Sequence, residues 1–356
     1  MTSAKEFKRP TLLKRRLIRL RQNIPSGGIM AVDKLIGRAA GLNSIPYFLP
    51  GEVSSPSYFI LGSGRSGNTL LRRLLMESFD TFIPPEMPGL GKCTRRLVQL
   101  RYRKWETYCR TFFSSFETSA NISVRNSENG IIYNLWAELK LDTRDLIRQS
   151  MDIPPQDRSG AALIHLLYQN ILSNADFQVT PRTIIGDKTP WNVMYTHQIE
   201  AFFPHARFVY IVRHPLAVAY SYVQSLSAVT GNSFEDAARR WARAQTNCLD
   251  LARRVGTERL RITQYETLVT SREESHRIGA FLQLPEWEGE RVTGPISSAD
   301  AKLVQHKRIN QRVDTSSVDT WRSEITGDMK KRLLKIVEPA MKRLDRELGI
   351  DYSENH

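Results

Sequence analysis

The chain has 356 residues, of which 41% are hydrophobic and 25% charged. This length and composition are typical of a soluble globular protein with one large domain or two small ones. The formal net charge of +14 predicts anionic partners, such as phosphates, sulfates, acidic glycans, nucleic acid or a membrane surface, without choosing among them. Three widely spaced cysteines argue against a disulfide framework and structural zinc, and no apolar run approaches the ~20 residues that span a bilayer. We therefore expect a cytoplasmic protein.

Residues 1–50 are predicted to form a basic extension that precedes the main domain, residues 51–356. The first 22 residues carry eight Lys or Arg and one acid, with Leu13, Leu17 and Leu20 at helical spacing. One interpretation is an amphipathic helix on the surface of an anionic membrane. The other is a solvated arm, or a helix laid over the domain.

Residues 57–78 read as a strand, a glycine-rich turn and a helix, which together are typical of an anion-binding loop. The turn is close to a Walker A motif, and Thr69 fits the template. However, Asn68 stands where the lysine belongs, and Arg65 supplies a cation inside the loop. A phosphate-binding loop with a relocated cation is one interpretation, and a purely structural glycine turn is the other.

The rest of the chain alternates short apolar strands with helices, which predicts a parallel sheet covered on both faces. We expect a three-layer α/β/α fold of the P-loop-like type. After the first helix, strands are expected at residues 81–83, 183–186, 207–212 and 260–262. Helices are expected at residues 90–105, 161–173, 191–203, 216–227, 234–255 and 328–348, with a further helix that ends near residue 282. The aromatic-rich residues 106–160 are predicted to be a helical insertion that could cover an acceptor site, although ordinary packing explains the aromatics equally well.

Basic side chains follow three of the predicted strands. Arg65, Lys188 and Arg213 should meet at one edge of the sheet, because ligands of parallel α/β sheets bind outside the carboxyl ends of the strands. Ser221 comes eight residues after Arg213, about two helical turns along. An arginine at a strand end and a serine from the following helix can hold a second phosphate from two directions.

These motifs resemble those of sulfotransferases that use 3′-phosphoadenylyl sulfate (PAPS). Residues 64–71, GRSGNTLL, resemble their 5′-phosphosulfate loop, and residues 213–221 resemble their 3′-phosphate motif. Residues 186–190, GDKTP, and 264–269, QYETLV, resemble two further motifs of the family. The resemblance covers about residues 57–350 and is closest to bacterial sulfotransferases related to the tyrosylprotein sulfotransferases. It implies a P-loop-like α/β fold and transfer of a sulfuryl group from PAPS to a hydroxyl or amine, with release of adenosine 3′,5′-bisphosphate.

The resemblance also implies roles for single residues. The 5′-phosphosulfate would be bound by Arg65, Ser66, Gly67, Asn68 and Thr69, of which Arg65 would also act in catalysis. Arg213 and Ser221 would bind the 3′-phosphate, and Tyr265 would contact the nucleotide. Lys188 would steady the bridging oxygen as negative charge develops on the leaving phosphate.

A general base is expected from the same comparison. Glu86 stands where the related tyrosine enzymes place a catalytic glutamate, although an ordinary turn carboxylate is the alternative. His165 is the reserve candidate, or else a core histidine of an apolar helix. Relatives often place Lys or Arg before the tryptophan at position 321, where this chain has Thr320. The cation that this position supplies to the 3′-phosphate in relatives is therefore expected to come from Lys307, Arg308 or Arg312.

No metal is expected, because a terminal sulfuryl carries less charge than a triphosphate, and fixed cations and N–H dipoles can suffice for its transfer. The basic surplus favours a glycan, glycolipid or other hydroxyl compound as acceptor, with a peptide tyrosine or a small alcohol still open. Two other functions compete with this one. A P-loop kinase is disfavoured by Asn68, and a non-catalytic sulfonucleotide- or polyanion-binding protein is disfavoured by Lys188 together with Glu86. Nucleic-acid binding is suggested by net charge alone, without a recognisable module.

Overall fold

The structure, a computed structural model, describes residues 55–87, 90–91, 104–120, 135–230, 233–289 and 315–352. All of them lie in one compact unit, Tyr47–His356. The basic N-terminal extension and the candidates Lys307, Arg308 and Arg312 lie outside the described residues.

Five parallel strands form the central sheet in the order β2-β3-β1-β4-β5. Their bounds are β1 (Tyr58–Gly62), β2 (Thr81–Phe82), β3 (Ile184–Lys188), β4 (Arg207–Val212) and β5 (Leu260–Gln264). β1 is central, and every one of its residues is buried, as expected for a parallel strand covered on both faces. The chain runs from β1 to one edge of the sheet, returns, and then continues to the other edge. The loop after β1 therefore lies at the point where the strand order reverses, which is where ligands bind in this class of sheet.

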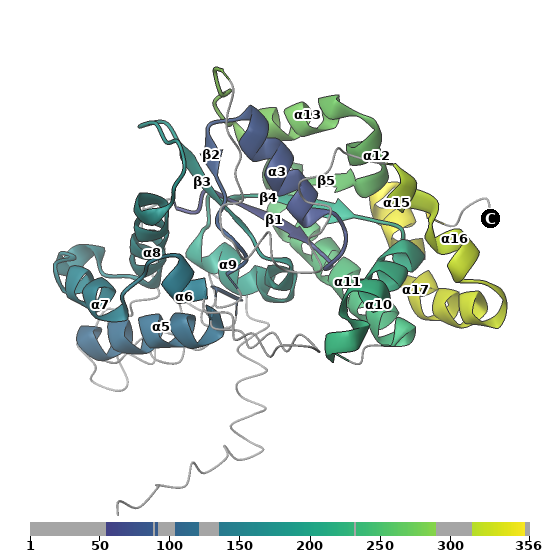
Figure 1. Cartoon of the computed structure of the whole chain (residues 1–356), viewed down its shortest axis with the longest axis horizontal. Helices are drawn as coiled ribbons and strands as arrows, with labels where there is room; N and C mark the ends of the chain where they lie inside the picture. The colour runs from purple at the N-terminus through teal and green to yellow at the C-terminus, as the bar shows by residue number, and fades with distance from the viewer. Residues whose placement is uncertain are drawn as a thin grey trace, which may run out of the picture. The chain divides into compact units, whose positions relative to one another are not determined.

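Helices cover both faces of the sheet (Figure 1). Their bounds are α3 (Asn68–Ser78), α5 (Trp105–Ala120), α6 (Leu135–Glu138), α7 (Thr143–Met151), α8 (Gly160–Asn174), α9 (Thr196–Phe202), α10 (Pro215–Thr230), α11 (Phe234–Arg259), α12 (Tyr265–Thr270), α13 (Arg272–Leu282), α15 (Ser316–Asp319), α16 (Trp321–Glu324) and α17 (Gly327–Leu348), with 3₁₀ turns η1 (Pro155–Asp157) and η2 (Pro190–Tyr195). α3, α12 and α13 lie on one face, and α9 and α11 lie on the other (Figure 1). The predicted three-layer α/β/α class is confirmed.

Most of the helix expected over residues 90–105 lies outside the described residues. Two other predicted helices differ from those observed. The helix expected over residues 191–203 is divided into η2 and α9, because the chain first makes a tight 3₁₀ turn in which Asn192 N–H donates to the Thr189 carbonyl at 2.9 Å. The helix expected over residues 234–255 continues to Arg259 across a break at Gly256, whose φ of 66° lies outside the helical range.

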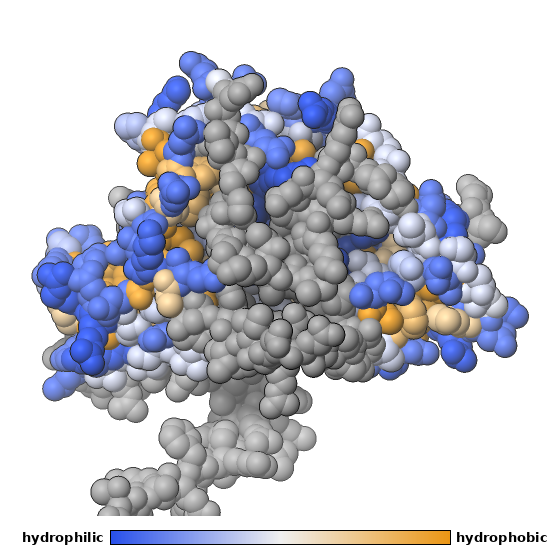
Figure 2. All heavy atoms as spheres, in the orientation of Figure 1, coloured by the Kyte–Doolittle hydropathy of each residue, from blue (hydrophilic) through white to orange (hydrophobic). Residues whose placement is uncertain are grey.

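The described residues between β2 and β3 include helices α5, α6, α7 and α8, of which the first three, apart from Trp105, lie within the segment 106–160. Its aromatic side chains are buried against one another, with Phe112 stacked on Phe116 at 4.7 Å between ring centroids. The outward surface of α5 and α7 is mostly hydrophilic (Figure 2), and the Arg110–Glu106 and Arg148–Asp145 ion pairs lie on it. For these described aromatics, ordinary packing is therefore the explanation.

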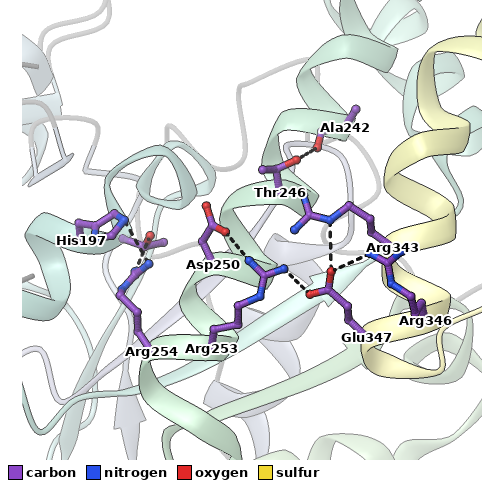
Figure 3. A network of polar contacts seen from close by, with 10 residues as sticks. His197, Ala242, Thr246, Asp250, Arg253, Arg254, Arg343, Arg346 and Glu347 are labelled. Atoms are coloured by element: carbon purple, nitrogen blue, oxygen red, sulfur yellow. Dashed lines mark hydrogen bonds and ion pairs between the residues drawn. The ribbon is translucent and has the colours of Figure 1, made fainter. Parts of the chain in front are cut away.

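The C-terminal helix α17 is attached to α11 by ion pairs as well as by apolar packing. Glu347 accepts hydrogen bonds from Arg253 of α11, at 2.7 Å, and from Arg343 of its own helix, at 3.2 Å (Figure 3). On the far side of α11, Arg254 binds Glu200 of α9 at 2.7 Å. Surface ion pairs contribute roughly 0.2–1 kcal/mol each, and these partly buried pairs supplement the apolar contact between the helices. None of the described helices is both long and apolar enough to cross a membrane.

Candidate active site

The loop between β1 and α3 is held in a shape that only unusual backbone conformations allow. Arg65 and Gly67 have φ of 66° and 99°, both in the left-handed region. For Arg65 this conformation costs on the order of 1–2 kcal/mol. The Ser63 and Ser66 hydroxyl oxygens lie 2.6 Å apart and brace the turn. Such a turn, followed by the N-terminus of an eleven-residue helix, directs backbone N–H groups at an anion.

Asn68 braces this loop from within. Its side-chain amide donates to the Ser63 carbonyl at 2.9 Å, and the side chain is buried. Gly62 makes the contact possible, because a Cβ there would lie 2.7 Å from Asn68 Oδ1. The residue in the Walker lysine position therefore shapes the loop with its side chain, while its backbone N–H belongs to the first turn of α3, where N–H groups lack helical partners.

Lys188 and Glu86 form an ion pair beside the loop. Lys188 Nζ lies 2.7 Å from Glu86 Oε1 and donates to Thr69 Oγ1 at 3.2 Å. The Lys188 side chain has no exposed surface, whereas the Glu86 side chain is 30% exposed. Lys188 is the last residue of β3 and Glu86 follows β2, so the pairing of these neighbouring strands brings the two together. A base candidate open to solvent and a buried ammonium thus meet at the loop.

Arg65, Ser221 and Arg213 form a second cluster on the other side of the loop. Arg65 Nε donates to Ser221 Oγ at 3.1 Å, and Arg213 Nη1 donates to the Arg65 carbonyl at 3.0 Å. Burial, followed by the positive charge of Arg213, lowers the pKa of the Arg65 guanidinium below its ordinary value. Two cations held this closely in a poorly solvated site favour the binding of an anion.

Tyr265 covers the end of this cluster. The Arg213 guanidinium lies 4.2 Å from the centroid of the Tyr265 ring, and the phenol oxygen lies 2.6 Å from Ser317 Oγ. The ring packs so closely on Gly67 that a Cβ there would come within 2.4 Å of Tyr265 Cδ2. Ser317 also accepts from Arg213 Nη2 through its carbonyl, at 2.5 Å. A glycine at position 67 is required both by its φ and by this ring.

A buried carboxylate lies immediately before Lys188. Asp187 Oδ2 accepts from the Tyr168 hydroxyl at 2.5 Å and Oδ1 accepts from Asn192 Nδ2 at 2.6 Å. Burial raises the pKa of Asp187 from 3.8 to about 6, in spite of these hydrogen bonds. Because the folded pKa lies above the ordinary one, the carboxyl stabilises the fold fully below pH ~4, and about 3 kcal/mol is lost as the pH rises through 6.

The predicted residues therefore fall into two groups that flank the loop. Thr69 joins Lys188 and Glu86, while Arg65 joins Arg213, Ser221 and Tyr265. His165 of α8 is a half-buried histidine whose pKa is lowered by burial, and its Nδ1 has no hydrogen-bond partner among the described residues.

Sequence reasoning missed three contributors, which are Ser317, Tyr222 and Thr189. Tyr222 packs on the loop, where a Cβ at Gly64 would lie 2.1 Å from its hydroxyl. Its place one residue after Ser221 was the available signal. Thr189 belongs to the GDKTP motif, but the motif alone indicates no role for it. Among the described residues, no three His, Cys, Asp or Glu side chains gather to hold a metal ion.

The chain matches a known protein family. A model described as "Sulfotransferase family" matches residues 56–289, which is more than half of the chain. The chain belongs to the sulfotransferase family. It is also 23% identical over 295 residues to a protein-tyrosine sulfotransferase of Drosophila melanogaster, across 79% of this chain and 50% of that protein. The chain thus spans about half the length of this distant relative.

Solved sulfotransferase structures resemble the fold. The sulfotransferase domain from the curacin biosynthetic pathway has a TM-score of 0.51 at 23% identity, with coverage of 82% of this chain and 98% of that domain. The sulfotransferase domain from the Synechococcus PCC 7002 olefin synthase has a TM-score of 0.48 at 23% identity, over 80% of this chain and 94% of that domain. At this level of identity, the first likeness supports the P-loop-like α/β fold alone.

Proposed function

We propose that this sulfotransferase moves the sulfuryl group of PAPS to a hydroxyl acceptor by in-line displacement and releases adenosine 3′,5′-bisphosphate. The observation that carries the proposal is the Lys188–Glu86 pair at the anion-binding loop, with 2.7 Å between ammonium and carboxylate. Transfer of a sulfuryl group from a phosphate to a hydroxyl requires a cation that stabilises the leaving phosphate and a base that accepts the hydroxyl proton. Lys188 and Glu86 place these two groups beside one loop.

The loop and the second cluster fit the two anionic ends of the donor. Arg65 and the N–H groups of residues 66–69 would bind the 5′-phosphosulfate, because the turn and the helix N-terminus favour negative charge. Arg213 and Ser221 would bind the 3′-phosphate, and Tyr265 would contact the nucleotide. Asn68, with its amide engaged inside the loop, offers no Walker lysine to a triphosphate, which supports PAPS over ATP.

In the proposed reaction each charged group has one task. Glu86 accepts the proton of the acceptor hydroxyl as the oxygen attacks sulfur. Lys188 stabilises the negative charge that the bridging oxygen takes up when the sulfur–oxygen bond breaks. Arg65 stabilises the transferred group from the loop. A preorganised charge of this kind is worth most in a site that excludes water, and Lys188 is fully buried.

A hydroxyl compound is the proposed acceptor, and the distant relative named as a protein-tyrosine sulfotransferase supports this class. A glycan or glycolipid acceptor, contact with an anionic membrane and a cytoplasmic location rest on charge and composition and remain predictions. Residues 106–160 as a cover for the acceptor are likewise a prediction, to which the buried aromatics of α5 lend no support.

The experiment is mass spectrometry of cell extracts and of a panel of hydroxyl compounds incubated with the protein and PAPS. The panel should include a tyrosine peptide, a small alcohol and an oligosaccharide. We expect one class to gain a sulfuryl group, in step with release of adenosine 3′,5′-bisphosphate, and a Lys188→Met protein to yield far less. Equal product from the wild-type and Lys188→Met proteins would contradict the proposed mechanism.

A further inference from the structure

The Asp187 carboxylate, which the proposed chemistry leaves unused, is tied to the residue that follows Glu86. Besides Tyr168 and Asn192, Asp187 Oδ2 accepts a longer hydrogen bond, at 3.4 Å, from the Thr189 hydroxyl. The same hydroxyl oxygen accepts the backbone N–H of Met87 at 2.9 Å. Both Asp187 and Thr189 have no exposed surface.

The direction of these bonds is set by the chemistry of a hydroxyl group. A threonine hydroxyl has one hydrogen to donate and two lone pairs that accept. Asp187, as a carboxylate, offers the acceptor for that hydrogen, which leaves a lone pair of Thr189 to face Met87. The buried carboxylate therefore orients the hydroxyl, and the hydroxyl anchors the backbone next to Glu86.

The turn η2 strengthens this anchor. Thr189 immediately precedes this turn, and Asn192 and Tyr195 lie three residues apart within it, on the same side. Tyr195 packs against the segment after Glu86 so closely that a Cβ at Gly91 would lie 2.3 Å from its ring. Asn192 binds the buried carboxylate, as described above. Through Asn192 and Tyr195, η2 thus contacts both the carboxylate and the chain that leads away from Glu86.

Glu86 depends on this support. Among the described residues, the hydrogen bond that its carboxylate makes is the one to Lys188. Its side chain is partly open to solvent, so its own packing fixes it weakly. The position of its backbone, set at Met87, therefore acts together with the buried Lys188 ammonium in placing the carboxylate.

We propose that Thr189 is a positioning residue, which acts through Met87 to hold Glu86 in place for the acceptor hydroxyl. The inference rests on the proposed function, because it takes Glu86 as the base. In this proposal Thr189 acts through the backbone of Met87 and does not itself contact the donor or the acceptor.

The test compares Thr189→Val, which keeps the shape and removes the hydroxyl, with Thr189→Ser, which keeps the hydroxyl. A displacement of about 1 Å at a reacting group can lower turnover about 100-fold, so we expect a fall of that order in kcat for Thr189→Val. Serine should restore most of it. The affinity for adenosine 3′,5′-bisphosphate should stay within about twofold in both, because the anion-binding clusters are untouched. The matched control is Thr263→Val in β5, a buried threonine whose hydroxyl has no hydrogen-bond partner among the described residues.

Hydrogen–deuterium exchange gives a second measurement that does not require activity. Peptides that contain Glu86 and Met87 should exchange faster in Thr189→Val, and at the wild-type rate in Thr189→Ser and Thr263→Val. The inference is overturned if exchange there is unchanged, if kcat equals that of the wild type, or if bisphosphate affinity falls by the same factor as kcat. A wild-type protein that neither binds the bisphosphate nor transfers sulfuryl would instead overturn the proposed function, and exchange at Met87 would still decide whether Thr189 anchors this segment.

Discussion

Replacing Lys188 by methionine should slow turnover far more than it weakens nucleotide binding. The ammonium is buried and contacts Glu86 and Thr69 at 2.7 and 3.2 Å, so methionine fills most of its volume and removes one positive charge. Loss of a single preorganised donor to a developing negative charge typically lowers kcat by about 10²–10³, or roughly 2.7–4 kcal/mol. We expect a fall in that range.

The affinity for the nucleotide and the stability of the fold should change less than kcat does in Lys188→Met. Arg65 and Arg213 remain to hold the nucleotide, so the dissociation constant for adenosine 3′,5′-bisphosphate should rise less than about tenfold, or ~1.4 kcal/mol. Removing one partner from a buried ion pair costs about 3–5 kcal/mol. Here the destabilisation should be smaller, because the Glu86 side chain is 30% exposed and water can solvate it.

The assay measures kcat at saturating PAPS, bisphosphate affinity by calorimetry, and unfolding by heat. Lys331→Met is the matched control, because this lysine lies in α17, outside the candidate site, and its side chain is 83% exposed. Equal losses in kcat and in affinity would show that Lys188 acts in binding. An unchanged kcat would refute the assignment of its charge to the leaving oxygen.

Three further results are expected. Glu86→Gln should lower kcat by about 10²–10⁴ with bisphosphate affinity unchanged, and an equal fall in calorimetric affinity would contradict its role as base. Gly67→Ala should weaken bisphosphate binding at least about tenfold, because the φ of Gly67 is 99° and an added Cβ would lie 2.4 Å from Tyr265. The control Gly327→Ala should leave the affinity unchanged, because Gly327 also has a positive φ, 55°, but an added Cβ would have no atom within 4 Å. Because burial raises the pKa of Asp187, the wild-type protein should lose about 3 kcal/mol of unfolding free energy between pH ~4 and ~6, and Asp187→Asn should not. Urea titration of both proteins at several pH values measures this difference. An equal dependence of unfolding free energy on pH in the two proteins would refute the raised pKa.

Much of the fold could be predicted because each strand is short, apolar and followed by a recognisable turn or helix. The strand before Gly62 and the strand before Arg213 are buried throughout or nearly so, and such runs are distinctive. The split of residues 191–203 into η2 and α9 could not be seen, since hydrophobic periodicity does not separate a 3₁₀ turn from the helix that follows it.

The sequence suggests which residues are candidates for the site, but it does not predict the contacts among them. Arg65, Lys188 and Arg213 were expected at one edge of the sheet, with Ser221 on the following helix, but the hydrogen bond from Arg65 Nε to Ser221 Oγ was not foreseen. The ion pair between Glu86 and Lys188 joins residues 102 positions apart, and it depends on which strands are neighbours, a property of the order β2-β3-β1-β4-β5. Ser317 lies within residues 286–320, where the sequence shows little regular hydrophobic pattern, so its approach to Arg213 had no signal in the sequence.

Calorimetric titration with adenosine 3′,5′-bisphosphate and with ATP–Mg²⁺ tests the central claim most directly. The account predicts that the bisphosphate binds, that Arg213→Met weakens it by at least about tenfold, and that ATP–Mg²⁺ binds far more weakly because Asn68 replaces the lysine of a nucleotide-triphosphate loop. Tight binding of ATP–Mg²⁺ with no binding of the bisphosphate would contradict it.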